Sequence, residues 1–159
     1  MKILIVSDTH KIHRYLDKAI EKEAPIDLLI HLGDTEGGED YIEAFAGCPS
    51  HIIAGNNDFF TNLPREKEFI LEGKRILLTH GHQYLVSMGE RRIKKEAKNR
   101  GIDIVMYGHT HVPSYSEEEG LIILNPGSIS IPRQSGYEHT YMVMELRKGE
   151  KVTCELRSV

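Results

Sequence analysis

Short apolar runs alternate with amphipathic stretches along most of the chain. Apolar runs bounded by turn residues predict buried strands, whereas apolar residues that recur every three or four positions predict helices. A helix over Ile12–Glu23, ended by Pro25, would place five apolar side chains on one face: Ile12, Tyr15, Leu16, Ala19 and Ile20. This alternation of strands and helices is typical of α/β layers.

The same patterns predict the remaining elements. Further helices are expected at Asp40–Ala46, closed by Gly47, and at Glu90–Asn99, closed by Arg100-Gly101. Strands are expected at Ile3–Val6, Asp27–Leu32, Ile52–Ala54, Arg75–Thr79, Ile104–Tyr107, Leu121–Leu124, Tyr141–Leu146 and Lys151–Leu156. Residues 59–72 mix Pro64 with charges, which indicates a loop and then an edge strand. Because helices concentrate in the first two thirds and strands in the last third, a pair of mixed sheets flanked by helices fits best.

Composition limits the class of protein. The 159 residues, 40% hydrophobic and 28% charged, suit a single globular domain over residues 1–159. Twenty Lys and Arg against 24 Asp and Glu give a net charge of −4, which argues against a dedicated nucleic-acid or membrane surface. No run is apolar enough to span a membrane and no targeting signal is visible, so a cytoplasmic protein with reduced Cys48 and Cys154 is expected. The sequence does not decide the oligomeric state, and a homo-oligomer is one possibility.

Polar motifs follow five of the predicted strands, each at the carboxyl end. In chain order they are Asp8-Thr9-His10, Gly33-Asp34, Gly55-Asn56-Asn57-Asp58, His80-Gly81-His82 and Gly108-His109-Thr110-His111. Each motif alone is ordinary turn chemistry, but turns do not explain why all five fall at the same kind of position. Ligands of open α/β sheets bind beyond the carboxyl ends of the strands, so we expect these side chains at one rim.

Carboxylate and imidazole groups are ligands of Mn, Fe, Co, Ni and Zn. The motifs contain no cysteine, which argues against a thiolate zinc site, and the imidazoles disfavour an oxygen-only Ca or Mg site. Asp8 and His10 could bind one ion, His109 and His111 neighbouring ions, with Asp34 between them. Two cations about 3.5–4 Å apart suit displacement at phosphorus.

Together the five motifs resemble the signature of the calcineurin-like metallophosphoesterases. The short chain, His80-Gly81-His82 and the later Asn125-Pro126-Gly127-Ser128 resemble the branch of YfcE-type phosphodiesterases, which is related to a retromer subunit of eukaryotes. The resemblance implies a four-layer αββα sandwich. It also implies that the Asn125–Ser128 loop closes over the metal rim.

The resemblance further implies a dinuclear centre with a shared carboxylate. One ion would be held by Asp8, His10, Asp34 and His111, and the other by Asp34, Asn56, His80 and His109. Two Mn²⁺ ions are the first expectation, with Ni²⁺, Co²⁺, Fe²⁺ or Zn²⁺ as alternatives. A hydroxide between the ions would attack a small phosphodiester, or another phosphate ester, in line. A binding scaffold of the same fold is the alternative, although such a protein would be expected to have lost ligands.

One position departs from the family pattern, because Asn57 stands where the wider family usually has His. An amide donates a hydrogen bond but supplies no proton near pH 7. The substrate would then need a leaving group that requires little protonation, or His82 or His13 takes the role. Asn57, Asp58 and His82 are therefore candidate catalytic residues, although Asp58 could instead orient a ligand or close a turn.

The sequence allows more than one role for two further features. His31 lies inside a predicted strand and is expected to be a hydrogen-bonded core residue or to support a ligand. Phe59-Phe60 forms a local apolar patch that could be core, a pocket wall or an oligomer contact.

Overall fold

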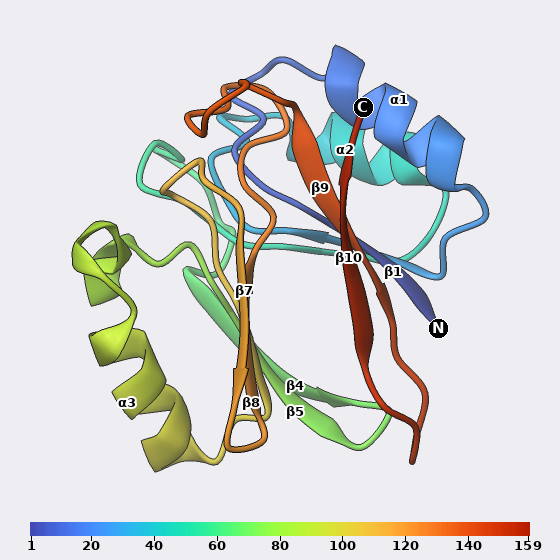
Figure 1. The fold of residues 1–159 in the computed structure, drawn as a ribbon. Coiled ribbons are helices and arrows are strands. Elements are labelled where there is room, and N and C mark those ends of the chain that lie inside the picture. The colour runs from blue at the N-terminus through green and yellow to red at the C-terminus, as the bar shows by residue number, and fades with distance from the viewer.

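Two five-stranded mixed sheets pack face to face in the computed structural model, which describes residues 1–159 (Figure 1). The first sheet has the order β10 (Thr153–Ser158), β9 (Thr140–Glu145), β1 (Lys2–Val6), β2 (Leu28–His31) and β3 (Ser50–Ile52). The second has the order β4 (Glu66–Leu71), β5 (Lys74–Thr79), β6 (Ile104–Met106), β8 (Leu121–Asn125) and β7 (Ser114–Glu118). In each sheet three parallel strands adjoin antiparallel ones.

Helices cover the outer faces of both sheets. Helices α1 (Arg14–Glu23) and α2 (Glu39–Ala46) lie over the first sheet, and α3 (Arg91–Arg100) lies over the second (Figure 1). Two short 3₁₀ turns, η1 (His82–Tyr84) and η2 (Val86–Met88), precede α3. The expected four-layer αββα sandwich of two mixed sheets is thus confirmed. None of the helices has the length and apolar character needed to cross a membrane.

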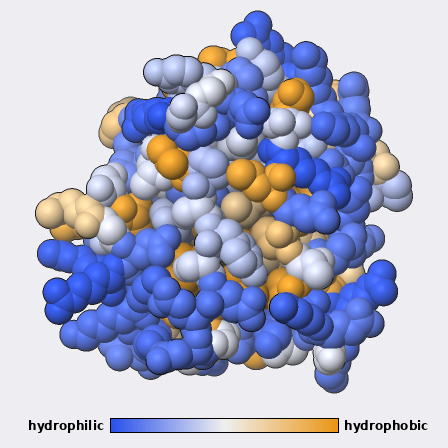
Figure 2. All heavy atoms as spheres, viewed as in Figure 1, coloured by the Kyte–Doolittle hydropathy of each residue, from blue (hydrophilic) through white to orange (hydrophobic).

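The core consists of three apolar layers, because successive strand residues point to opposite faces. Along β1, Ile3 and Ile5 pack between the sheets, whereas Leu4 and Val6 pack under α1 and α2. A third layer joins the second sheet to α3, where Ile93 is fully buried. Strands buried on both faces explain the continuous apolar runs. Polar residues cover most of the face shown in Figure 2, with apolar residues in small separate areas.

Element boundaries differ from the predictions at a few points. Helix α1 begins at Arg14 rather than Ile12, because Lys11 has a left-handed φ of 62° and the Ile12 N–H still closes a turn on Thr9. Strand β3 pairs two residues earlier than expected, since its ladder on β2 ends at Ile52. The edge strand β7 was not predicted.

Candidate metal centre

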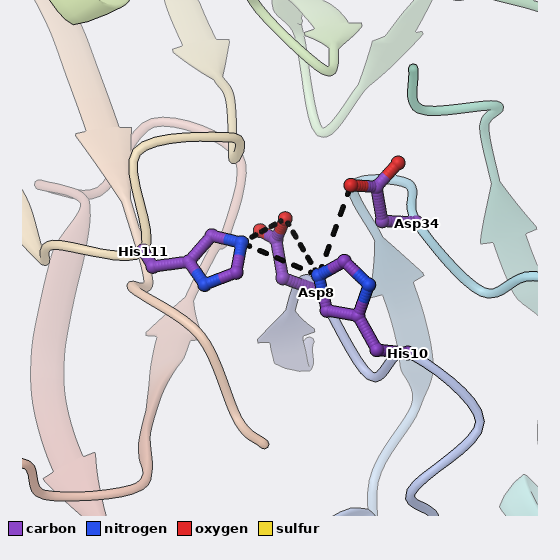
Figure 3. Close-up of side chains that lie close together, drawn as sticks. All are labelled: Asp8, His10, Asp34 and His111. Carbon is purple, nitrogen blue, oxygen red and sulfur yellow. Dashed lines mark hydrogen bonds and ion pairs between the residues drawn. The ribbon is translucent and has the colours of Figure 1, made fainter. Parts of the chain in front are cut away.

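Four of the predicted ligands meet where the loops after β1, β2 and β6 come together. Asp8, His10, Asp34 and His111 each offer a ligand atom, and these atoms lie within 4.8 Å of one another. Figure 3 shows the four side chains pointing toward a common space. His111 Nε2 lies 3.1 Å from Asp8 Oδ1, and His10 Nε2 lies 3.8 Å from Asp34 Oδ2.

A second group of donors adjoins the first through Asp34. Asn56 Oδ1 lies 3.0 Å from His80 Nε2 and 2.8 Å from His109 Nδ1. Asp34 Oδ2 is 3.5 Å from His80 Nε2. The structure therefore brings all seven predicted ligands together, in two groups that both include Asp34.

Hydrogen bonds outside the centre fix the tautomers of three histidines. Each donates its Nδ1–H to an oxygen, so in the neutral ring Nε2 carries the lone pair that faces the centre. The pairs are His10 with Glu36 Oε1 at 2.6 Å, His80 with Leu32 O at 2.7 Å, and His111 with Ile131 O at 2.6 Å. These hydrogen bonds hold the three rings with Nε2 toward the shared space, as metal binding would require.

The donor set fits a cation. Nε2 of His10 and Nε2 of His111 are 3.3 Å apart, and two facing lone pairs at this distance repel unless a positive charge lies between them. Asp8 Oδ1 is buried without an aligned hydrogen-bond donor, even though His111 is close. Buried acceptors without donors are unfavourable, and a divalent ion would satisfy several of them at once.

The charges of the centre suit metal binding. Burial raises the pKa of Asp34, but the hydrogen bond and charge of His80 and the bonds from Asn57 outweigh it, so the pKa lies below its usual range. Burial lowers the pKa of His109, and the neighbouring His80 lowers it further. An ionised carboxylate and a neutral imidazole are the forms that bind metal. Burial lowers the pKa of His80, but Asp34 and Asp8 outweigh it and raise that pKa, so a metal ion would displace a proton from His80 Nε2.

Five of the seven ligands have a left-handed backbone, which non-glycine residues rarely adopt. Their φ angles are 56° for Asp8, 46° for His10, 58° for Asp34, 69° for His109 and 60° for His111. Such conformations concentrate at functional sites, where surrounding contacts hold them. Here the Asp8 N–H donates to Gly33 O at 3.0 Å and the His10 N–H to Asp34 O at 3.0 Å. The first two motifs are thus tied to each other.

Asp58 faces the loops and not the space between the ligands. Its Oδ2 accepts from the N–H groups of Asp34 and Gly55, both at 2.7 Å. Its Oδ1 accepts from the Glu36 N–H at 2.5 Å and the Thr35 hydroxyl at 3.1 Å. Both oxygens are occupied and the residue is buried, so Asp58 joins the loop after β2 to the loop after β3.

Asn57 contacts Asp34 directly. Its backbone N–H donates to Asp34 Oδ1 at 2.8 Å and its amide to Asp34 Oδ2 at 2.7 Å. The carboxylate that both donor groups share is therefore fixed in orientation by one residue.

Three further histidines singled out by the sequence occupy three different places. The His82 ring lies 5.6 Å from the His80 ring, and its Nδ1 is buried without a partner, so it borders the centre. The His13 ring lies 4.4 Å from the Tyr41 ring, tilted by 32° against it, and is not among the side chains that bond the two donor groups. His31 is fully buried, contacts the Thr9 hydroxyl at 3.1 Å and supports the loops from behind.

Three residues outside the candidate site residues support the centre, and two of them belong to the Asn125–Ser128 loop that the resemblance placed over the rim. Glu36 orients His10, and no sequence signal marked it except its place two residues after Asp34. Asn125 donates to Gly108 O at 2.8 Å, and the Ser128 hydroxyl donates to Asp8 O at 2.8 Å. The Asn-Pro-Gly-Ser turn therefore braces two ligand-bearing loops.

Comparison with known proteins identifies the family. Residues 1–149 match the model of the calcineurin-like phosphoesterase superfamily domain, and the chain belongs to this superfamily. The probable metallophosphoesterase YsnB of Bacillus subtilis is 31% identical over 149 residues, covering 92% of this chain and 85% of that protein. The phosphodiesterase MJ0936 of Methanocaldococcus jannaschii is 31% identical over 145 residues, covering 80% of this chain and 83% of that protein.

Solved structures agree with the fold. A predicted phosphoesterase from Streptococcus pneumoniae superposes with a TM-score of 0.85 at 26% identity, covering 99% of this chain and 88% of that one. Vps29 of Entamoeba histolytica in complex with Zn²⁺ shares the fold, with a TM-score of 0.79 at 22% identity and 99% of each chain covered.

Proposed function

We propose that this protein is a phosphodiesterase that uses two divalent metal ions to hydrolyse a small phosphate ester. The position of Asp34 carries the proposal, because its Oδ2 lies 3.8 Å from His10 Nε2 and 3.5 Å from His80 Nε2. One ion would be held by Asp8, His10, Asp34 and His111, and the other by Asp34, Asn56, His80 and His109. Mn²⁺ is our first choice, and the same donors suit Ni²⁺, Co²⁺, Fe²⁺ and Zn²⁺.

A bound metal pair would polarise the phosphoryl oxygens and supply a water acidic enough to react near neutral pH. The protein supplies the alignment. Asn57 fixes the shared carboxylate of Asp34 with two hydrogen bonds, and Asp58 holds the two loops that carry it. In this proposal both residues position a ligand rather than move a proton.

His82 is the group that we assign to the leaving oxygen. It is half-buried beside His80 and His109, with ring centres 5.6 Å and 6.0 Å away, and its Nδ1 has no protein partner. A protonated imidazole at the edge of the centre would transfer a proton to the leaving ester oxygen. The amide of Asn57 can donate a hydrogen bond but cannot transfer a proton.

The substrate class follows from charge and from one relative. The archaeal relative with 31% identity is named a phosphodiesterase, which favours a diester over a monoester. The net charge of −4 argues against a long polyanion. Cys48 and Cys154 are free thiols, in keeping with the expected cytoplasmic location.

The direct test is hydrolysis of bis(p-nitrophenyl) phosphate by protein loaded with Mn²⁺, and its loss on chelation with EDTA. Asp34→Asn should lower kcat/KM by at least about 100-fold, more than loss of a residue outside the metal shell does. Asp40→Asn is the matched control, because Asp40 is exposed on α2.

The scaffold alternative predicts a different result. A protein that binds metal at the seven ligands but hydrolyses no ester with Mn²⁺, Ni²⁺, Co²⁺ or Fe²⁺ would be a metal-binding interaction module of the same fold. Turnover that survives EDTA or Asp34→Asn would contradict the metal centre itself.

A further inference from the structure

A pocket of about 390 Å³ opens beside the metal centre. It is lined by Lys11, Glu36, Gly37, Asn57, Phe59 and Phe60. Two of these residues also touch metal ligands, since Glu36 bonds His10 and Asn57 bonds Asp34. The volume lies in the range of sites for small ligands, so part of an ester bound at the metals would extend into it.

Two adjacent aromatic residues that line this pocket are exposed. The exposed fraction is 72% for Phe59 and 109% for Phe60. Phe60 also has a left-handed φ of 58°, which is unusual for a bulky side chain. Rings this exposed gain little from core packing, and the backbone of Phe60 is strained as well, so a ligand explains their placement better than the fold does.

Lys11 is the only cation among the lining residues. It directly follows the ligand His10, is exposed, and has a left-handed φ of 62°. The pocket therefore offers two aromatic faces and one ammonium group next to the predicted position of the phosphate. Exposed aromatic side chains bind the π-face of any base, and a lysine binds phosphate as a point charge.

We propose that the pocket binds the nucleoside part of the substrate, with the base against Phe59 and Phe60 and the phosphate charge near Lys11. This inference rests on the proposed function and names its substrate class as a nucleotide-sized phosphate ester. One pair of rings and one lysine fit a single nucleoside.

A fluorescence experiment tests stacking without measuring catalysis. The chain has no Trp, so Phe60→Trp places the only indole at the pocket. The variant is loaded with Zn²⁺, which is not paramagnetic, and titrated with AMP or with ribose 5-phosphate. We expect saturable quenching by AMP alone. Ile70→Trp is the control, because Ile70 is 69% exposed on β4, outside the pocket lining.

Calorimetry on the metal-loaded protein measures the contribution of the base. AMP should bind at least about tenfold more tightly than ribose 5-phosphate, which lacks only the base. Phe60→Leu, which stays apolar, should reduce this ratio toward one, whereas Phe60→Tyr should keep it. Lys11→Met should weaken both ligands by a similar factor, and Lys18→Met, on the exposed side of α1, should weaken neither.

Three outcomes would overturn the inference. Equal affinities of the wild type for AMP and ribose 5-phosphate would mean that the base does not bind in the pocket. Equal quenching of Phe60→Trp and Ile70→Trp would mean nonspecific contact. If a ten-nucleotide oligodeoxyadenylate binds more than 100-fold tighter than AMP, the ligand of the pocket is the end of a nucleic acid and not a single nucleotide.

The outcomes separate this inference from the proposed function. Hydrolysis of bis(p-nitrophenyl) phosphate together with equal affinities refutes the nucleoside pocket alone. Failure to hydrolyse any ester with any of the metals refutes the proposed function, whatever the quenching shows.

Discussion

Replacing Asp58 by Asn tests whether this residue positions the metal ligands. The two side chains have almost the same shape, so packing is retained while one carboxylate oxygen becomes an NH₂ group. Asp58 accepts four hydrogen bonds, two at each oxygen, from residues 34, 35, 36 and 55. The new NH₂ group would face two donors at whichever oxygen it replaces.

The structure sets the expected size of the effect. Each hydrogen bond to a charged acceptor contributes about 1.5–3 kcal/mol, so losing two at a buried site destabilises the protein by roughly 3–6 kcal/mol. For a chain of this length about 2–4 °C of Tm corresponds to 1 kcal/mol, which gives a decrease of roughly 6–24 °C. The Asp34 and Glu36 backbones would lose their anchor, so metal affinity should fall about 10–100-fold.

The assay combines thermal denaturation of metal-free protein with Mn²⁺ titration in competition with a chelating dye. At saturating Mn²⁺, Asp58→Asn should regain most of the wild-type kcat, because the residue does not touch the substrate. Asp103→Asn is the control, since Asp103 accepts one exposed bond from the Arg75 N–H at 2.7 Å and should shift Tm little.

Two results would refute this reasoning. An unchanged Tm would mean that the four hydrogen bonds add nothing to stability. Normal stability and metal affinity with lost kcat would mean that Asp58 acts on the substrate itself.

Three further predictions follow from other parts of the structure. Burial raises the pKa of Glu23, but Arg157 and two other partners outweigh it and lower the pKa from 4.5 to about 2. Between pH 5 and pH 2 the free energy of unfolding of the wild type should therefore fall by about 3 kcal/mol more than that of Glu23→Gln. His82→Asn should reduce kcat/KM more for aryl diesters whose leaving phenol has a high pKa than for p-nitrophenyl esters. Gly55→Ala should lower metal affinity and stability, because a Cβ there would clash with the Asp34 carboxylate.

Each of these predictions has a contradicting result. Parallel urea-midpoint profiles of the wild type and Glu23→Gln across that pH range would refute the ionised network. If His82→Asn lowers kcat/KM equally for all leaving groups, His82 does not act on the leaving oxygen. Wild-type Mn²⁺ affinity in Gly55→Ala would show that the loop accommodates the methyl group.

The fold was predictable where apolar periodicity is strong. Strands β1, β5 and β6 have side chains buried on both faces or between layers, so their sequences are continuous apolar runs. Strand β7 was not predicted because Ser114–Glu118 is a mostly exposed edge strand whose polar side chains carry no alternation. The early start expected for α1 failed because Ile12 fits the helical period but lies in the preceding turn.

The convergence of the candidate ligands was predictable because their motifs follow strands directly, and strand ends converge in this architecture. The supporting contacts were not, because they depend on tertiary placement. Glu36 and His10 are 26 residues apart, and Ser128 and Asp8 are 120 apart. Asp58 stood in a recognisable motif, but only the structure shows that its oxygens face backbone N–H groups.

The most direct test of the shared-ligand centre is anomalous diffraction from crystals of the Mn²⁺-loaded protein. We expect two peaks, both within coordination distance of the Asp34 carboxylate, one beside His10 and His111 and the other beside His80 and His109. A single peak, or two peaks without Asp34 between them, would contradict it.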